Sequence, residues 1–334
     1  MKRNTLIDII KYIMAICVIA MHTYSNKTVE VGRLYHTVVS SAVPFFFMAS
    51  GYLTNVVEQS SQVAKGRIIR YIRLYIIWNI VYMPAAIYGN LINNDSVIKS
   101  ILLYFRGFFL IGEHYMSWPL WYLLSMIYLL AAIKYLKSRL IKDETIWMIS
   151  AVVYVIATVM TKMAESVDYA IYYDGTVNIA AKLIKITFGG GRLFTGLLLY
   201  CAGWILAVSK QKGNFLFSCN RTASNIFALM GLCICFMISV IRFNAITGTI
   251  LVPAIILYLC IVNGSIIKKQ TSIGFQSTVM YYTHMLIYFV VILIFYNGKP
   301  RYGLTSFLTV TVIDCMISAV VSKFRTNKLV KMLF

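Results

Sequence analysis

The chain has 334 residues, of which 60% are hydrophobic and 13% are charged, and its formal net charge is +20. This composition leaves too little polar surface to cover a soluble globule, which excludes a soluble enzyme or a soluble nucleic-acid-binding protein. The positive charge is better matched by anionic lipid headgroups and by an anionic ligand. We therefore expect an integral membrane protein with membrane lipid, and no nucleic acid, among its partners.

Apolar stretches of about 20 residues, long enough to cross roughly 30 Å of hydrocarbon, recur along the chain. They predict spans at residues 6–24, 36–54, 71–92, 118–136, 145–163, 193–209, 223–241, 247–264, 277–297 and 303–322. The segment from Ile98 to Ile111 carries Arg106 and is short and interrupted, which predicts an interfacial or re-entrant helix. The fold class is therefore an all-α polytopic transmembrane bundle of about ten spans.

Positive charge orients this bundle, because Lys and Arg accumulate in cytoplasmic loops. Most of the 31 Lys and Arg residues fall on the cytoplasmic side if the N-terminus lies inside, so we expect both termini in the cytoplasm. Ionisable residues within the first apolar stretch favour a retained helix over a cleaved signal peptide. No linker or repeat divides the chain, which predicts one integral domain over residues 1–334. The seven cysteines have no metal-ligand spacing, so we expect neither disulfides nor a metal.

The first span contains three ionisable residues, Asp8, Lys11 and His22. An intramembrane ionisable group is a functional candidate by default. At about 100° per residue the three side chains share one helix face, and a rise of about 1.5 Å per residue separates Lys11 from His22 by roughly 16 Å. They are therefore suited to contact two ends of one long ligand. The alternative for Asp8 and Lys11 is a structural ion pair that makes their burial tolerable.

Six blocks of sequence, in chain order, resemble the acyltransferase-3 family of bacterial membrane proteins. The blocks are Ile7 to Thr23, Val43 to Leu53, Lys65 to Arg73, Trp118 to Leu123, Gly191 to Gly203, and Tyr281 to His284. The family has a basic residue eleven positions before a histidine, usually Arg where this chain has Lys11. An ammonium lacks the bidentate fork of a guanidinium, so it holds phosphate or carboxylate differently. The first two blocks look most similar to membrane domains fused to vancomycin-resistance serine racemases and to surface-polysaccharide acyltransferases.

The resemblance implies a membrane O-acyltransferase in the bacterial cytoplasmic (inner) membrane. Such an enzyme transfers an acyl group, commonly acetyl from acetyl-CoA, to a hydroxyl of an extracytoplasmic glycan or cell-envelope acceptor. Acyl-CoA is then a donor substrate, and no cofactor is bound permanently. His22 is suited to accept the acceptor proton or relay the acyl group. Lys11 is suited to hold an anionic part of the donor or to stabilise charge on the acyl carbonyl.

A basic row formed by Arg67, Arg70 and Arg73 lies where the third span enters the membrane. Guanidinium groups at this spacing suit the phosphates of coenzyme A arriving from the cytoplasm. The alternative is a positive-inside anchor whose side chains extend to lipid headgroups. The position of the same row in the family favours donor binding.

Secondary candidates are Glu113, His114, Arg192, His284 and His36. Glu113 and His114 precede the Trp-rich block, and Arg192 follows a run of three glycines. His284 fits its family block, but a hydrogen bond between packed helices explains it nearly as well. A lone histidine near a membrane interface, such as His36, is more often hydrogen-bonded filler than a catalyst.

A transporter is the rival interpretation. The racemase-fused relatives are associated with serine supply, and midplane charges in a helical bundle are also what a substrate pathway requires. The substrate would be a small molecule such as serine, or a glycan intermediate. Against it, the sequence has no Gly- or Pro-broken helices placed symmetrically in two halves.

Overall fold

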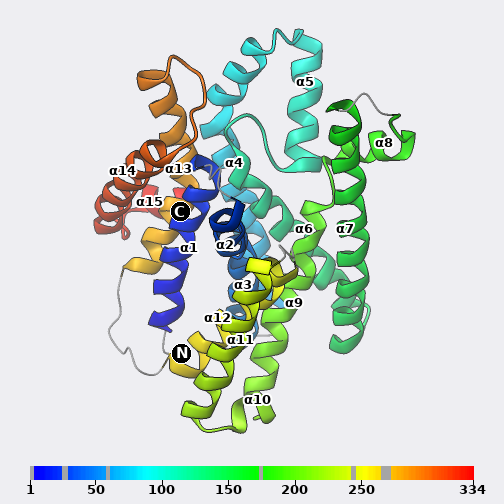
Figure 1. The fold of residues 1–334 in the computed structure, drawn as a ribbon, viewed down its shortest axis with the longest axis vertical. Coiled ribbons are helices and arrows are strands. Elements are labelled where there is room, and N and C mark those ends of the chain that lie inside the picture. Colours follow the sequence, from blue (N-terminus) through cyan, green and yellow to red (C-terminus); the bar gives the residue numbers. More distant parts are fainter. Residues whose placement is uncertain (1–3, 25–28, 58–60, 173–175, 242–245, 265–271) are drawn as a thin grey trace. The chain divides into compact units, whose positions relative to one another are not determined.

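The computed structural model describes residues 4–24, 29–57, 61–172, 176–241, 246–264 and 272–334, and every regular element in these ranges is a helix (Figure 1). Within them, nine helices are long and apolar enough to cross a membrane. A shorter apolar helical segment, Thr247–Asn263, coincides with another of the predicted spans. The predicted polytopic all-α fold is therefore confirmed.

Two compact units make up the fold. The terminal unit contains residues 1–58 and 202–334, and the middle unit contains residues 59–201. Each is described below by itself.

The centre of the terminal unit is formed by α1 (Thr5–Thr23), which packs against α13 (Ile273–Phe295) and α14 (Leu304–Lys323) (Figure 1). Asn4 begins α1, because its side-chain oxygen accepts hydrogen bonds from the amides of Leu6 and Ile7 at 3.1 and 3.3 Å. At the other end, the amide of Gly303 donates to the Thr23 carbonyl oxygen at 2.9 Å. The bond between Gly303 and Thr23 holds the beginning of α14 beside the end of α1.

The predicted span 36–54 consists of two helices, α2 (Val29–Ser40) and α3 (Ala42–Val57), which meet at Ser41. Pro44 lies in the first turn of α3, where its missing amide hydrogen costs nothing. Together α2 and α3 supply the apolar stretch Gly32–Thr54, which is one of the nine candidate spans.

Further helices belong to the terminal unit. They are α10 (Phe215–Ser218), α11 (Arg221–Ile241), the π-helical turn η3 (Thr247–Leu251), α12 (Val252–Asn263) and α15 (Lys328–Leu333). α12 packs against α3, α11 and α1. An amide pair joins α11 to α12, since Asn263 Nδ2 donates to Asn225 Oδ1 at 2.7 Å.

The middle unit is built mainly from long helices. Its elements are α4 (Ser61–Ile92), α5 (Val97–Arg106), the π-helical turn η1 (Gly107–Ile111), the 3₁₀ turn η2 (Trp118–Leu120), α6 (Trp121–Ser138), α7 (Asp143–Tyr172), α8 (Ile179–Phe188) and the first half of α9 (Arg192–Gln211). The segment predicted as a short, interrupted helix is α5 followed by η1, and it is not among the candidate spans.

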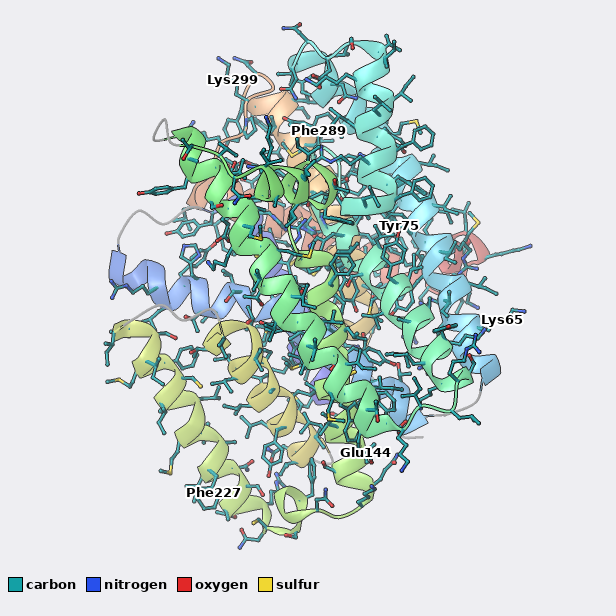
Figure 2. The ribbon with its side chains drawn as sticks, turned by 90° about the vertical axis from the view of Figure 1, so that its right-hand side faces the viewer. Lys65, Tyr75, Glu144, Phe227, Phe289 and Lys299 are labelled. Atoms are coloured by element: carbon teal, nitrogen blue, oxygen red, sulfur yellow. The ribbon has the colours of Figure 1, made fainter. Side chains whose placement is uncertain are left out.

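Several spans carry exposed apolar side chains, as a lipid-facing surface requires. Phe227 of α11 (Figure 2), Val155 of α7 and Val312 of α14 are 67%, 62% and 56% exposed. In water such surfaces would promote association, whereas in a bilayer they meet hydrocarbon.

Candidate active site

The helix α1 carries all three ionisable residues predicted for the first span. Because α1 is unbroken from Thr5 to Thr23, the axial separation of roughly 16 Å between Lys11 and His22 follows from helix geometry. Asp8 is buried, whereas Lys11 and His22 are half-buried. His22 lies in the last turn of the helix.

His22 and His284 come together from α1 and α13. Their rings stack with centroids 5.7 Å apart and planes inclined by 19°. His284 is fully buried, and the ring of Tyr281 approaches it edge-on with centroids 6.4 Å apart. The structure therefore places His284, a secondary candidate, in contact with His22, a primary candidate.

One ring nitrogen of His284 forms a hydrogen bond within α13. Nδ1 lies 2.9 Å from the main-chain oxygen of Met280, and a carbonyl oxygen only accepts, so Nδ1 carries the hydrogen. Nε2 then holds the lone pair, and it is buried without a partner among the described residues. An unsatisfied buried nitrogen costs stability, so its presence calls for a functional explanation.

Asp314 is a buried acidic residue that the sequence reasoning missed. It lies on α14, is fully buried, and its Oδ1 is 2.6 Å from Thr283 Oγ1, on the residue before His284. Asp314 is the only acidic residue in the apolar helix Leu304–Lys323. The rule that singled out Asp8, that an ionisable residue inside a span is a functional candidate, applies equally to Asp314.

The middle unit holds the predicted donor row. Arg67, Arg70 and Arg73 all lie on α4, which begins before Lys65 and continues past Tyr75 (Figure 2). Arg70 and Arg73 are exposed, and Arg67 is half-buried, with a buried Nη1 that has no partner among the described residues. The row therefore presents guanidinium groups that a phosphate can reach.

A second polar cluster of the middle unit joins Glu113 to Arg192. Their side chains form an ion pair, and the guanidinium of Arg192 lies over the Trp121 ring, 4.7 Å from its centroid. His114 stacks on Tyr104 with centroids 4.4 Å apart and planes 7° apart. Burial lowers the pKa of His114 to about 4, so its ring is neutral at physiological pH.

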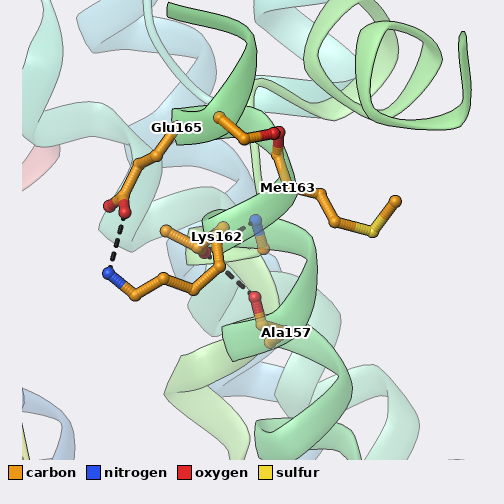
Figure 3. A network of polar contacts seen from close by, with 7 residues as sticks. Ala157, Lys162, Met163 and Glu165 are labelled. Atoms are coloured by element: carbon orange, nitrogen blue, oxygen red, sulfur yellow. Dashed lines mark hydrogen bonds and ion pairs between the residues drawn. The ribbon is translucent and has the colours of Figure 1, made fainter. Parts of the chain in front are cut away.

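Glycines make this cluster possible. A Cβ atom at Gly107 would lie 2.3 Å from Cε1 of His114, and one at Gly191 would lie 1.8 Å from the Ala157 carbonyl oxygen of α7. Figure 3 shows this part of α7, with Ala157 and the exposed pair Lys162 and Glu165. The glycine before Arg192 therefore permits close packing of α9 on α7.

His36 takes no part in either group. It lies on α2 with an exposed side chain, and its ring meets Tyr35 edge-on with centroids 5.5 Å apart. The role of His36 therefore stays a prediction.

A family model described as an acyltransferase domain matches residues 4–320, almost the whole chain. The chain belongs to the acyltransferase-3 family. As a member of this family it is an acyltransferase that transfers groups other than aminoacyl groups, and its apolar helices make it a multi-pass membrane protein. The match includes both histidines of the stack, the α4 arginine row and Asp314. Among curated proteins and solved structures, none matches this acyltransferase significantly.

Proposed function

We propose that this acyltransferase is an O-acyltransferase of the bacterial cytoplasmic membrane. It moves an acyl group, most simply acetyl, from acyl-CoA to a hydroxyl of an extracytoplasmic glycan or cell-envelope acceptor. The family supports the reaction class. The observation that carries the proposal is the stack of His22 on a fully buried histidine, which holds a proton-accepting ring at the end of α1.

The proposed chemistry is a direct transfer. His22 accepts the hydroxyl proton, the acceptor oxygen bonds to the thioester carbonyl carbon, and the carbon–sulfur bond breaks. The CoA sulfur leaves as a thiolate and takes the proton back from His22, so no net proton is consumed. Lys11 lies roughly 16 Å from His22 along α1, so in this step it holds an anionic part of the donor and not the carbonyl oxygen that reacts beside His22. Asp8 supports Lys11 as a neighbouring carboxylate.

In this proposal Arg67, Arg70 and Arg73 bind the phosphates of coenzyme A. Guanidinium groups form short, charge-assisted hydrogen bonds with phosphate oxygens. Two of the three are exposed, and the third has a buried nitrogen without a partner in the described part of the chain, which supports a role as ligand-binding groups. The topology predicted from the positive charges places both termini in the cytoplasm, on the side from which acyl-CoA arrives.

The deciding experiment uses the full-length protein in lipid nanodiscs with radiolabelled acetyl-CoA. Wild type, Lys11→Ala and His22→Ala are compared, with His36→Ala as the matched control because His36 is exposed. We expect saturable binding and label release or transfer by wild type and the His36 variant, with turnover lost in the His22 variant. Absence of binding to folded wild type, together with serine uptake into proteoliposomes, would show a transporter instead.

A further inference from the structure

The number of hydrogens available at the contact between Thr283 of α13 and Asp314 of α14 determines whether Asp314 is protonated. Thr283 Oγ1 lies 2.8 Å from the carbonyl oxygen of Val279 and 2.6 Å from Asp314 Oδ1. A threonine hydroxyl has one hydrogen to donate, and a carbonyl oxygen only accepts. Both contacts are complete hydrogen bonds together only when Asp314 is protonated. The carboxyl group then donates to Thr283, and Thr283 donates to Val279.

The surroundings of Asp314 favour the same neutral state. The residue is fully buried, and its second oxygen, Oδ2, has no partner among the described residues. No described lysine or arginine therefore forms a hydrogen bond to that oxygen. A carboxylate in such an environment would carry a large desolvation penalty, which a neutral acid avoids.

Two helices, α13 and α1, pack against α14 near Asp314. On α13, Thr283 contacts Asp314, and His284 is the next residue. From α1, the Tyr12 hydroxyl donates to Cys315 Sγ at 3.2 Å, on the residue after Asp314. Lys11 precedes Tyr12 on α1 and is half-buried.

We propose that Asp314 is a proton-binding site that stays protonated at neutral pH and acts as a positioning residue. As a neutral donor it holds Thr283, and so fixes the rotation of α13 that places His284 against His22. The catalytic consequence rests on the proposed function, whereas the protonation state stands independently of it. Loss of the proton would leave the single Thr283 hydrogen to be divided between Asp314 and Val279.

Infrared spectroscopy of the full-length protein in nanodiscs tests the protonation state. Wild type is compared with Asp314→Asn and with Asp8→Asn, the matched control from the other buried acid within a span. We expect a protonated-carboxyl carbonyl band at neutral pH that shifts in D₂O, disappears in the Asp314 variant and persists in the Asp8 variant. A wild-type spectrum without this band, or a band that survives in Asp314→Asn, would overturn the proposal.

Turnover of labelled acetyl-CoA tests the positioning role. An amide also donates a hydrogen bond, so Asp314→Asn should retain most of the turnover, whereas Asp314→Ala and Thr283→Val should each lose about tenfold. Thr278→Val is the matched control, because the hydrogen bond of Thr278 among the described residues stays within α13, to Gly274 O at 3.2 Å. Equal loss in the Asn and Ala variants would overturn the positioning role. If wild type shows no turnover, the proposed function fails, and the infrared result still decides the protonation state.

Discussion

Nδ1 of His284 lies 2.9 Å from the main-chain oxygen of Met280, one turn earlier in α13. This bond selects the tautomer and leaves Nε2 as the nitrogen with the lone pair. The same ring stacks on His22. A single backbone contact thus determines which nitrogen of the buried ring is available to accept a hydrogen bond or a proton.

His284→Phe should separate stability from activity. Phenylalanine keeps a ring against His22 but removes the unsatisfied Nε2, whose burial costs about 1–3 kcal/mol. We expect a melting temperature at or above that of wild type, with turnover of labelled acetyl-CoA reduced at least about tenfold. Thermal unfolding and initial rates on the same preparation provide the measurement. Wild-type turnover in His284→Phe would remove Nε2 from the mechanism, and His36→Phe serves as the unaffected control.

The pH dependence of stability should report His114. Burial lowers its pKa to about 4 in the folded protein, from an ordinary value of 6.5. The unfolded chain therefore binds the proton first as pH falls, so this contribution to stability is complete above pH 6.5 and is lost as pH falls toward 4. The loss is at most about 3–4 kcal/mol, since one pKa unit corresponds to about 1.4 kcal/mol.

His114→Phe tests this dependence, because phenylalanine preserves the stack on Tyr104 without a titrating nitrogen. Melting temperatures measured from about pH 7.5 to pH 5 should fall less steeply for the variant than for wild type. Parallel curves would contradict the predicted role of His114.

Gly203 should tolerate no side chain. A Cβ atom there would lie 1.8 Å from the Met48 carbonyl oxygen, so Gly203→Ala must force α9 away from α3. We expect a loss of at least about 2 kcal/mol, as is usual for overpacking. Gly32 of α2 has nothing within 4 Å of the same position, so Gly32→Ala should be neutral or stabilising by up to about 1 kcal/mol. Melting curves in one detergent compare the two, and equal shifts would contradict the close approach of α3 and α9.

The ion pair of Arg192 with Glu113 should contribute more to stability than the pair of Lys162 with Glu165. Arg192 also lies over Trp121, whereas the side chains of Lys162 and Glu165 are 73% and 59% exposed (Figure 3). We expect Arg192→Lys to lower the melting temperature, since lysine loses the planar guanidinium, and Lys162→Arg to leave it unchanged. An unchanged melting temperature in Arg192→Lys would show that the stacked geometry is energetically unimportant.

The α4 row should control donor affinity. Arg67→Ala and Arg70→Ala should each raise the KM for acetyl-CoA by about tenfold or more, because each removes a charge-assisted contact to phosphate. Arg139→Ala is the control, since Arg139 instead packs over Tyr135, 5.3 Å from its ring centroid. Donor titrations at two ionic strengths provide the measurement. An unchanged KM in both row variants would leave the row as a membrane anchor.

Each predicted span coincides with an apolar helical stretch of the structure, and the short segment after α4 is not among the candidate spans. The sequence missed the break at Ser41, because apolarity continues through it from α2 into α3. It also missed Asp314, although the argument that identified Asp8 applies to both. The roles predicted for Lys11, His22 and the arginine row stay predictions.

The sequence by itself determined that this protein is a multi-pass helical acyltransferase with three ionisable residues in its first span. Span length and apolarity are local properties, and the family blocks are contiguous stretches of chain. Only the tertiary structure decided that His22 meets His284, that Thr283 meets Asp314 and that Glu113 pairs with Arg192. Those contacts join residues on different helices, and helical periodicity states which residues share a face but not which helix packs against that face.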